Sequence, residues 1–157
     1  MKKVLYIVIP IIILLTILLI ILLIPKKEEK VMINNITHMS FYYSQGYAIN
    51  SDIRYYLDCE EKCIAKVKPY GISEEDIKEI EVDNTFIKKV ANVLNKYEVI
   101  QWDGFDRYMK DVLDGDSFSL YLTANDNIDI HASGYMMWPD NYKEVREELD
   151  NLFNSLI

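Results

Sequence analysis

Hydrophobic residues follow three patterns along the chain: one unbroken run, alternation at every second position, and repeats every three or four positions. The unbroken run covers residues 4–24, which contain no charged residue. As a helix with a rise of 1.5 Å per residue it would span about 31 Å, which matches a bilayer core of about 30 Å. It is longer than the apolar part of a cleaved signal peptide, and no small-residue cleavage site follows it. We therefore expect a single uncleaved transmembrane anchor over residues 1–24.

Alternation of apolar and polar residues predicts two β-hairpins. The first turns at residues 60–62, so that Leu57 faces Ala65 and Tyr55 faces Val67. The second turns at residues 125–127 and pairs Ala124 with Ile128, Leu122 with Ile130, Leu120 with Ala132 and Phe118 with Gly134. In both registers one face is largely apolar and the other polar, which is the arrangement that a half-buried sheet requires.

Helical spacing predicts two amphipathic helices, one from about residue 84 to 97 and one after Pro139. Between them, residues 102–117 are expected to form a connection with turns. The apolar stripes are Phe86, Val90, Val93, Leu94 and Tyr97 in the first helix, and Tyr142, Val145, Leu149, Leu152, Phe153 and Leu156 in the second. The predicted fold class is α+β: an antiparallel sheet built from hairpins and covered by the two helices. Residues 25–38 are expected to form a polar linker between the anchor and a domain over 39–157.

Charge excludes one class of partner. Lys2 and Lys3 account for two of the 17 basic residues, so 15 remain beyond residue 24 against 25 acidic residues, a net charge of −10. Nucleic-acid binding needs clustered Lys and Arg, so we expect none. The basic residues on the two sides of the apolar run do not decide its orientation by the positive-inside rule.

The two cysteines bear on the orientation. Cys59 and Cys63 face each other at the end of the first hairpin, where the separation of Cα atoms permits a disulfide. A disulfide persists on an oxidising side of the membrane. The alternative is two free buried thiols. On the disulfide interpretation, the C-terminal domain lies on the extracytoplasmic side of the cell membrane.

Aromatic residues provide the only candidate binding surface. The chain lacks glycine-rich phosphate loops, nucleophile elbows and metal-ligand spacings, so no catalytic, cofactor-binding or metal-binding residue is expected. Aromatic residues exceed what a small core needs, and such residues dominate binding hot spots. The expected surface comprises Trp102, Phe105, Tyr121, His131, Tyr135 and Trp138. The alternative is that aromatic residues pack under the connection 102–117.

Four short strings suggest a relationship: Trp102-Asp103-Gly104-Phe105, residues 112–120 (VLDGDSFSL), residues 130–135 (IHASGY) and residues 139–142 (PDNY). Over about residues 79–156 the chain resembles small, uncharacterised domains of Gram-positive bacteria that often follow an N-terminal anchor or lipoprotein signal. It departs from the lipoprotein members because no acceptor cysteine follows the apolar run. The resemblance implies a cell-surface setting and an α+β fold, and it implies no activity for any residue.

Together these patterns favour a non-enzymatic, single-pass membrane-anchored module that binds a protein or cell-envelope ligand. Two alternatives remain. The charge of −10 would suit an accessory or immunity-type protein that sequesters a basic partner. A hydrolase would use the sheet face that carries Tyr121 and His131, where Ser119 and Ser133 lie nearby.

Overall fold

The computed structural model describes residues 31–46, 48, 52–125 and 127–157. The expected anchor over residues 1–24 and the first part of the expected linker lie outside these residues. No helix within the described part of the chain has the length and apolar character needed to cross a membrane. The chain from Val31 onward forms one compact unit.

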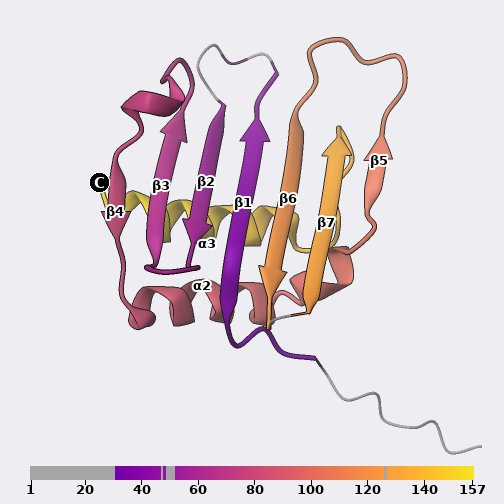
Figure 1. Ribbon diagram of the computed structural model, residues 1–157. Coiled ribbons are helices and arrows are strands. Elements are labelled where there is room, and N and C mark those ends of the chain that lie inside the picture. Colours follow the sequence, from indigo (N-terminus) through magenta and orange to yellow (C-terminus); the bar gives the residue numbers. More distant parts are fainter. Residues whose placement is uncertain (1–30, 47, 49–51, 126) are drawn as a thin grey trace, which may run out of the picture. The chain divides into compact units, whose positions relative to one another are not determined.

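The described residues form a seven-stranded sheet with the strand order β4-β3-β2-β1-β6-β7-β5 (Figure 1). The strands are β1 (Ile36–Ser44), β2 (Ile53–Asp58), β3 (Ile64–Pro69), β4 (Glu79–Glu81), β5 (Asp106–Tyr108), β6 (Ser117–Ala124) and β7 (Ile128–Tyr135). The helices are α2 (Asn84–Lys96) and α3 (Tyr142–Asn154), with short 3-10 helices η1 (Glu74–Asp76) and η2 (Val99–Trp102). Neighbouring strands are antiparallel except β5, which runs parallel to β7. The fold is therefore α+β, as the sequence predicted.

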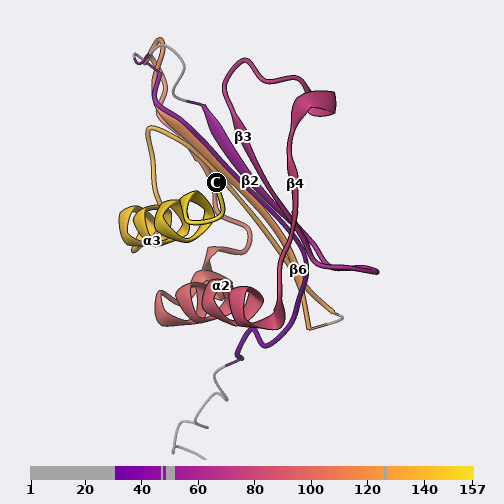
Figure 2. The same ribbon diagram turned by 90° about the vertical axis from the view of Figure 1, so that its left-hand side faces the viewer.

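Both helices lie on one side of the sheet (Figure 2) and cross its strands (Figure 1). Their buried residues meet the inward-facing residues of the central strands, and Phe153 of α3 stacks on Tyr55 of β2 with 4.6 Å between ring centroids. The first turn of α2 is capped by Asp83, whose carboxylate accepts a 2.9 Å hydrogen bond from the N–H of Phe86. The opposite side of the sheet carries no α-helix among the described residues, only the short 3-10 helix η1 at its β3–β4 end.

The two predicted hairpins are confirmed, register included. Leu57 pairs with Ala65 and Tyr55 with Val67. In the second hairpin all four predicted pairs occur, from Ala124 with Ile128 to Phe118 with Gly134. Both amphipathic helices also form at the predicted positions, and most residues of the expected stripes are buried. Tyr97, Leu152 and Leu156 are only partly buried, and Tyr97 and Leu156 lie beyond the helix ends.

The folded unit begins earlier than the boundary expected at residue 39. Ile33 is only 2% exposed, and strand β1 starts at Ile36. The side chain of Asn95 in α2 accepts a 2.8 Å hydrogen bond from the N–H of Ile33 and donates a 2.7 Å hydrogen bond to its carbonyl oxygen. Because the register shifts between Ile36 and His38, both Ile36 and Met39 face the core, and simple alternation does not reveal this strand.

The connection over residues 102–117 contains β5, which the sequence did not predict. This strand has three residues, and Asp106 pairs with Ser133 of β7. A parallel pair so short leaves almost no periodic signal in the sequence. Its consequence is that residues 103–106 lie beside the outer edge of β7.

Candidate functional site on the open sheet face

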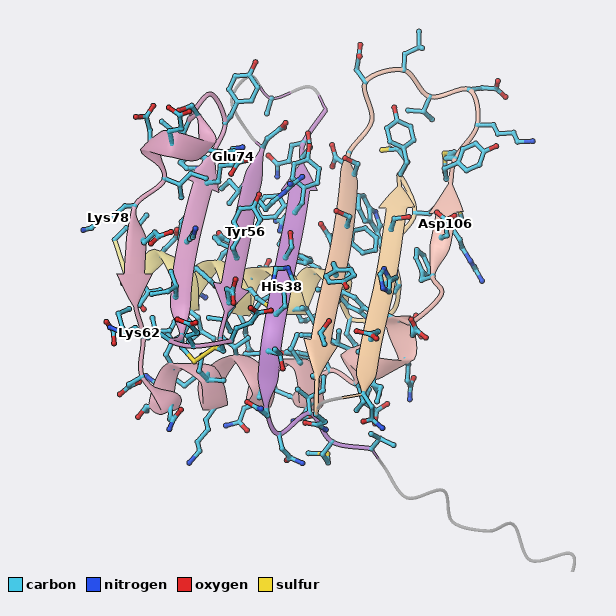
Figure 3. All side chains as sticks on the ribbon, viewed as in Figure 1. His38, Tyr56, Lys62, Glu74, Lys78 and Asp106 are labelled. Atoms are coloured by element: carbon cyan, nitrogen blue, oxygen red, sulfur yellow. A yellow bond between two sulfur atoms is a disulfide. The ribbon has the colours of Figure 1, made fainter. Side chains whose placement is uncertain are left out.

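We call the side of the sheet without α-helices the open face, and Figure 3 looks directly at it. Its side chains alternate along each strand with the buried residues that face the helices. On the central strands the open face includes His38, Ser40, Tyr42, Arg54, Tyr56, Asp58, Lys66, Lys68, Ser119, Tyr121, Thr123, Asp129, His131 and Ser133. The face therefore combines aromatic rings, hydroxyl groups and charges.

Tyr121 lies between the two histidines of the chain. The ring of His131 on β7 meets it edge-on with 4.4 Å between centroids, and the ring of His38 on β1 does so at 5.5 Å. Tyr121 is nevertheless 41% exposed, so part of its ring is accessible to a ligand. The sequence predicted the pair of Tyr121 and His131 but not His38, because that residue was assigned to the linker.

Three carboxylates accept hydrogen bonds from residues of β6 and β7 in this part of the face. Asp103 accepts a 3.1 Å hydrogen bond from the N–H of His131, and Asp106 accepts a 2.7 Å hydrogen bond from the hydroxyl of Ser133. Asp129 accepts a 2.8 Å hydrogen bond from the hydroxyl of Thr123. None of the three takes part in the ion pairs formed among the described residues. This half of the open face is therefore negatively charged.

The same region is hollowed. A shallow depression of about 450 Å³ is lined by residues that include Ser40, Phe105, Asp106, Tyr121, His131 and Ser133. A volume of this size would take a single side chain of a partner or a small ligand. The side chains at its rim are already held by hydrogen bonds or ring contacts, so little ordering would accompany binding.

The half of the open face over β2 and β3 is electrostatically balanced. Lys66 pairs with Glu79 at 2.6 Å, and Lys68 pairs with Glu74. The guanidinium of Arg54 lies 4.9 Å from the ring centroid of Tyr42 and donates a 3.2 Å hydrogen bond to the hydroxyl of Tyr56. None of these residues belonged to the six-residue surface expected from the sequence, although their alternation with buried residues was visible.

The remaining aromatic residues of the expected surface lie elsewhere. Trp102 is 2% exposed and packs against Phe118, while its indole N–H donates a 3.1 Å hydrogen bond to the carbonyl oxygen of Asp140. It therefore contributes to the core and offers no surface.

Tyr135 and Trp138 also have structural contacts. The Tyr135 hydroxyl accepts a 2.6 Å hydrogen bond from the N–H of Gly115 and donates a 3.1 Å hydrogen bond to the carbonyl oxygen of Val112, which supports the interpretation that it packs beneath the connection. Trp138 is 38% exposed but stacks on Tyr142, away from the open face. Of the six residues, Tyr121 and His131 lie together, with Phe105 beside them.

Cys59 and Cys63 lie at disulfide distance at the end of the first hairpin, with 4.0 Å between their Cα atoms (Figure 3). Each stands one residue beyond the paired strands β2 and β3. The predicted proximity of the two cysteines is therefore confirmed.

The hollow contains the residue types of a serine hydrolase without their usual connection. The Ser133 hydroxyl donates to Asp106, and the His131 imidazole contacts the ring of Tyr121. Within the described part of the chain, no hydrogen bond joins that imidazole to a serine, and no group of three acidic, histidine or cysteine residues could hold a metal ion.

Comparison with known proteins adds nothing to this picture: no protein-family model matches the chain, and no curated protein matches it.

Proposed function

We propose that the protein is a non-enzymatic, single-pass membrane-anchored module that binds a basic segment of a protein ligand on the extracytoplasmic side. The observation that carries the proposal is the exposed ring of Tyr121 in a hollow whose lining includes the carboxylate of Asp106. Asp103 and Asp129, which accept hydrogen bonds from residues of the neighbouring strands, add two further carboxylates outside the lining. The apolar run over residues 4–24 supports the anchor.

The residue types of the open face suit protein recognition. Tyrosine and arginine are enriched in binding hot spots, and Tyr42, Tyr56, Tyr121 and Arg54 are all on this face. Hydrogen bonds within the face hold several of these side chains before a ligand arrives. The entropy lost on binding is correspondingly reduced.

Charge favours a basic ligand. A Lys or Arg side chain placed over the Tyr121 ring would gain a cation–π interaction, and the three nearby carboxylates would attract the same charge. The net charge of −10 beyond residue 24 would also steer a basic ligand toward the domain and repel an acidic one.

The test uses the full chain in detergent micelles and a labelled peptide of repeating Lys-Gly-Ser triplets. We expect saturable binding that weakens steeply with added salt. The double substitution Asp106→Asn with Asp129→Asn should weaken it about tenfold or more, which corresponds to about 1.4 kcal/mol. The matched control, Glu60→Gln with Glu61→Gln, removes the same charge from the β2–β3 turn and should leave the affinity nearly unchanged. Equal losses in the two double variants would contradict the proposal, because any acidic surface would then suffice.

A hydrolase remains the second candidate, because His131 and Ser133 line the same hollow. It predicts that the full chain cleaves p-nitrophenyl acetate and that His131→Ala abolishes the cleavage. The binding proposal predicts no turnover above the rate of the buffer. Turnover that depends on His131 would replace the binding proposal.

A further inference from the structure

A second cavity, of about 260 Å³, lies where β1 ends and α3 begins. Its lining consists of Ser44, Asp116, Trp138, Tyr142, Lys143 and Arg146. None of these residues lines the hollow around Tyr121, so the cavity is a separate candidate site.

Arg146 is the unusual residue of this cavity. Its guanidinium carbon lies 5.1 Å from the ring centroid of Tyr43, and its Nε atom is buried without a hydrogen-bond partner. Among the described residues it forms no ion pair. Asp150, one turn further along the helix, acts electrostatically on Arg146, while its carboxylate accepts hydrogen bonds from the hydroxyls of Tyr43 and Tyr55. A guanidinium keeps its charge in a protein, so an anion in the cavity that Arg146 lines would lie beside a cation that has no ion-pair partner among the described residues.

The neighbours of Arg146 define the kind of anion. Lys143 adds a second cation whose pairing with Glu147 is loose, at 3.8 Å. Asp116 contributes one negative charge, and one of its oxygens accepts a 3.0 Å hydrogen bond from the N–H of Gly46. Two cations against one carboxylate leave a net charge of about +1 in the lining, and Asp150, which acts electrostatically on Arg146, lies outside the lining. That balance suits a monoanion better than a doubly charged phosphate.

The wall of the cavity is aromatic. Trp138 stacks on Tyr142 with 4.6 Å between centroids and 16° between ring planes, and Trp138 is 38% exposed. The exposed indole of Trp138, with the cations of Arg146 and Lys143 in the same lining, would accommodate a planar apolar group that carries a negative charge. Arginine binds a carboxylate through two parallel hydrogen bonds, which matches a flat ligand.

We propose that this cavity binds a small carboxylic acid with a planar apolar body, its carboxylate on Arg146 and Lys143 and its body against Trp138. The proposal is independent of the function proposed for the open face. It assigns a role to the guanidinium of Arg146, which forms no ion pair among the described residues, and to the exposed part of Trp138.

The experiment follows the fluorescence of Trp138 in the full chain during titration with benzoate at fixed ionic strength. Trp102 is 2% exposed and provides a constant background. We expect a saturable change with benzoate, weaker binding of acetate and of inorganic phosphate, and about tenfold weaker or no binding of the neutral isostere benzamide.

Two variants and one control separate a binding role from a structural one. Arg146→Gln should weaken benzoate binding about tenfold, and Lys143→Gln should weaken it several-fold. The exposed Lys88→Gln on α2 should have no effect. Lys143 is 77% exposed, so its variant keeps the test decisive even if Arg146→Gln unfolds. Equal responses to benzoate and benzamide, or unchanged affinity in Lys143→Gln, would overturn the proposal. The variant Asp106→Asn should leave benzoate binding intact, so failure at one site can be distinguished from failure at the other.

Discussion

The hydroxyl of Tyr55 in β2 donates a 2.9 Å hydrogen bond to Oδ1 of Asp150 in α3, across 95 residues of sequence. The hydroxyl of Tyr43 in β1 donates a 3.2 Å hydrogen bond to the other carboxylate oxygen. One acidic side chain of the helix is thereby joined to two neighbouring strands. Burial raises the pKa of Asp150 and also the pKa values of Tyr43 and Tyr55.

The first prediction concerns this connection. Tyr55→Phe removes one donor from the half-buried Asp150 carboxylate and should lower the free energy of unfolding by about 1–2 kcal/mol. Tyr121→Phe is the control, because the Tyr121 hydroxyl forms no hydrogen bond among the described residues. Urea denaturation followed by circular dichroism measures both variants. Equal midpoints would show that the hydrogen bond contributes nothing to stability.

The second prediction concerns pH. Burial raises the pKa of Asp150 in the folded protein above its ordinary value of 3.8, so between the two values the folded state binds more protons than the unfolded state. The contribution of Asp150 to stability is therefore greatest below about pH 3.8 and declines as pH rises through the folded pKa. In Asp150→Asn this dependence is absent. The unfolding free energy of the parent minus that of the variant should fall with rising pH, and an increase would contradict the assignment.

The third prediction concerns the start of the folded unit. Asn95→Ala removes both hydrogen bonds to the backbone of Ile33 and should cost about 1–3 kcal/mol. Hydrogen exchange at residues 33–36 should accelerate in the same variant. The exposed Asn92→Ala on the same helix provides the control. If both variants behave like the parent, the segment before β1 is not fixed by Asn95.

The parts of the fold that depend on residues close together in the sequence could be predicted, whereas those that depend on distant residues could not. Both hairpins were predictable because strand period and turn position fix a local register, as in the pairing of Leu120 with Ala132. The place of β1 between β2 and β6 was not, because the pairing of Met39 with Leu122 leaves no signal in either segment alone.

The candidate site was predictable to a similar extent. The pairing of Tyr121 with His131 followed from the hairpin register. His38 was missed together with β1. Trp102 was expected on the surface because the number of aromatic residues does not show which way each side chain points. In the structure η2 positions its indole in the core. Arg146 gave no signal, since its missing partner is a property of the packed structure.

The fourth prediction concerns the cysteines and the orientation of the chain. Intact cells are treated with a membrane-impermeant thiol reagent before and after reduction. On the proposed extracytoplasmic location, Cys59 and Cys63 should be labelled only after reduction. Reduction should also lower the free energy of unfolding by about 2 kcal/mol, because the bond closes a short loop. Labelling that requires cell lysis but no reductant would contradict both the disulfide and the orientation.

The fifth prediction tests the central claim, that the open face binds a basic protein segment around Tyr121. The measurement is the affinity of the full chain for the labelled Lys-Gly-Ser peptide in Tyr121→Ala and in Tyr108→Ala. Tyr108 on β5 is 64% exposed and lies outside the lining of the hollow. Tyr108→Ala therefore removes an exposed tyrosine without changing the hollow and is the matched control. The proposal predicts that Tyr121→Ala weakens binding about tenfold or more while Tyr108→Ala retains the affinity of the parent. Unchanged affinity in Tyr121→Ala, with the fold intact by circular dichroism, would contradict it.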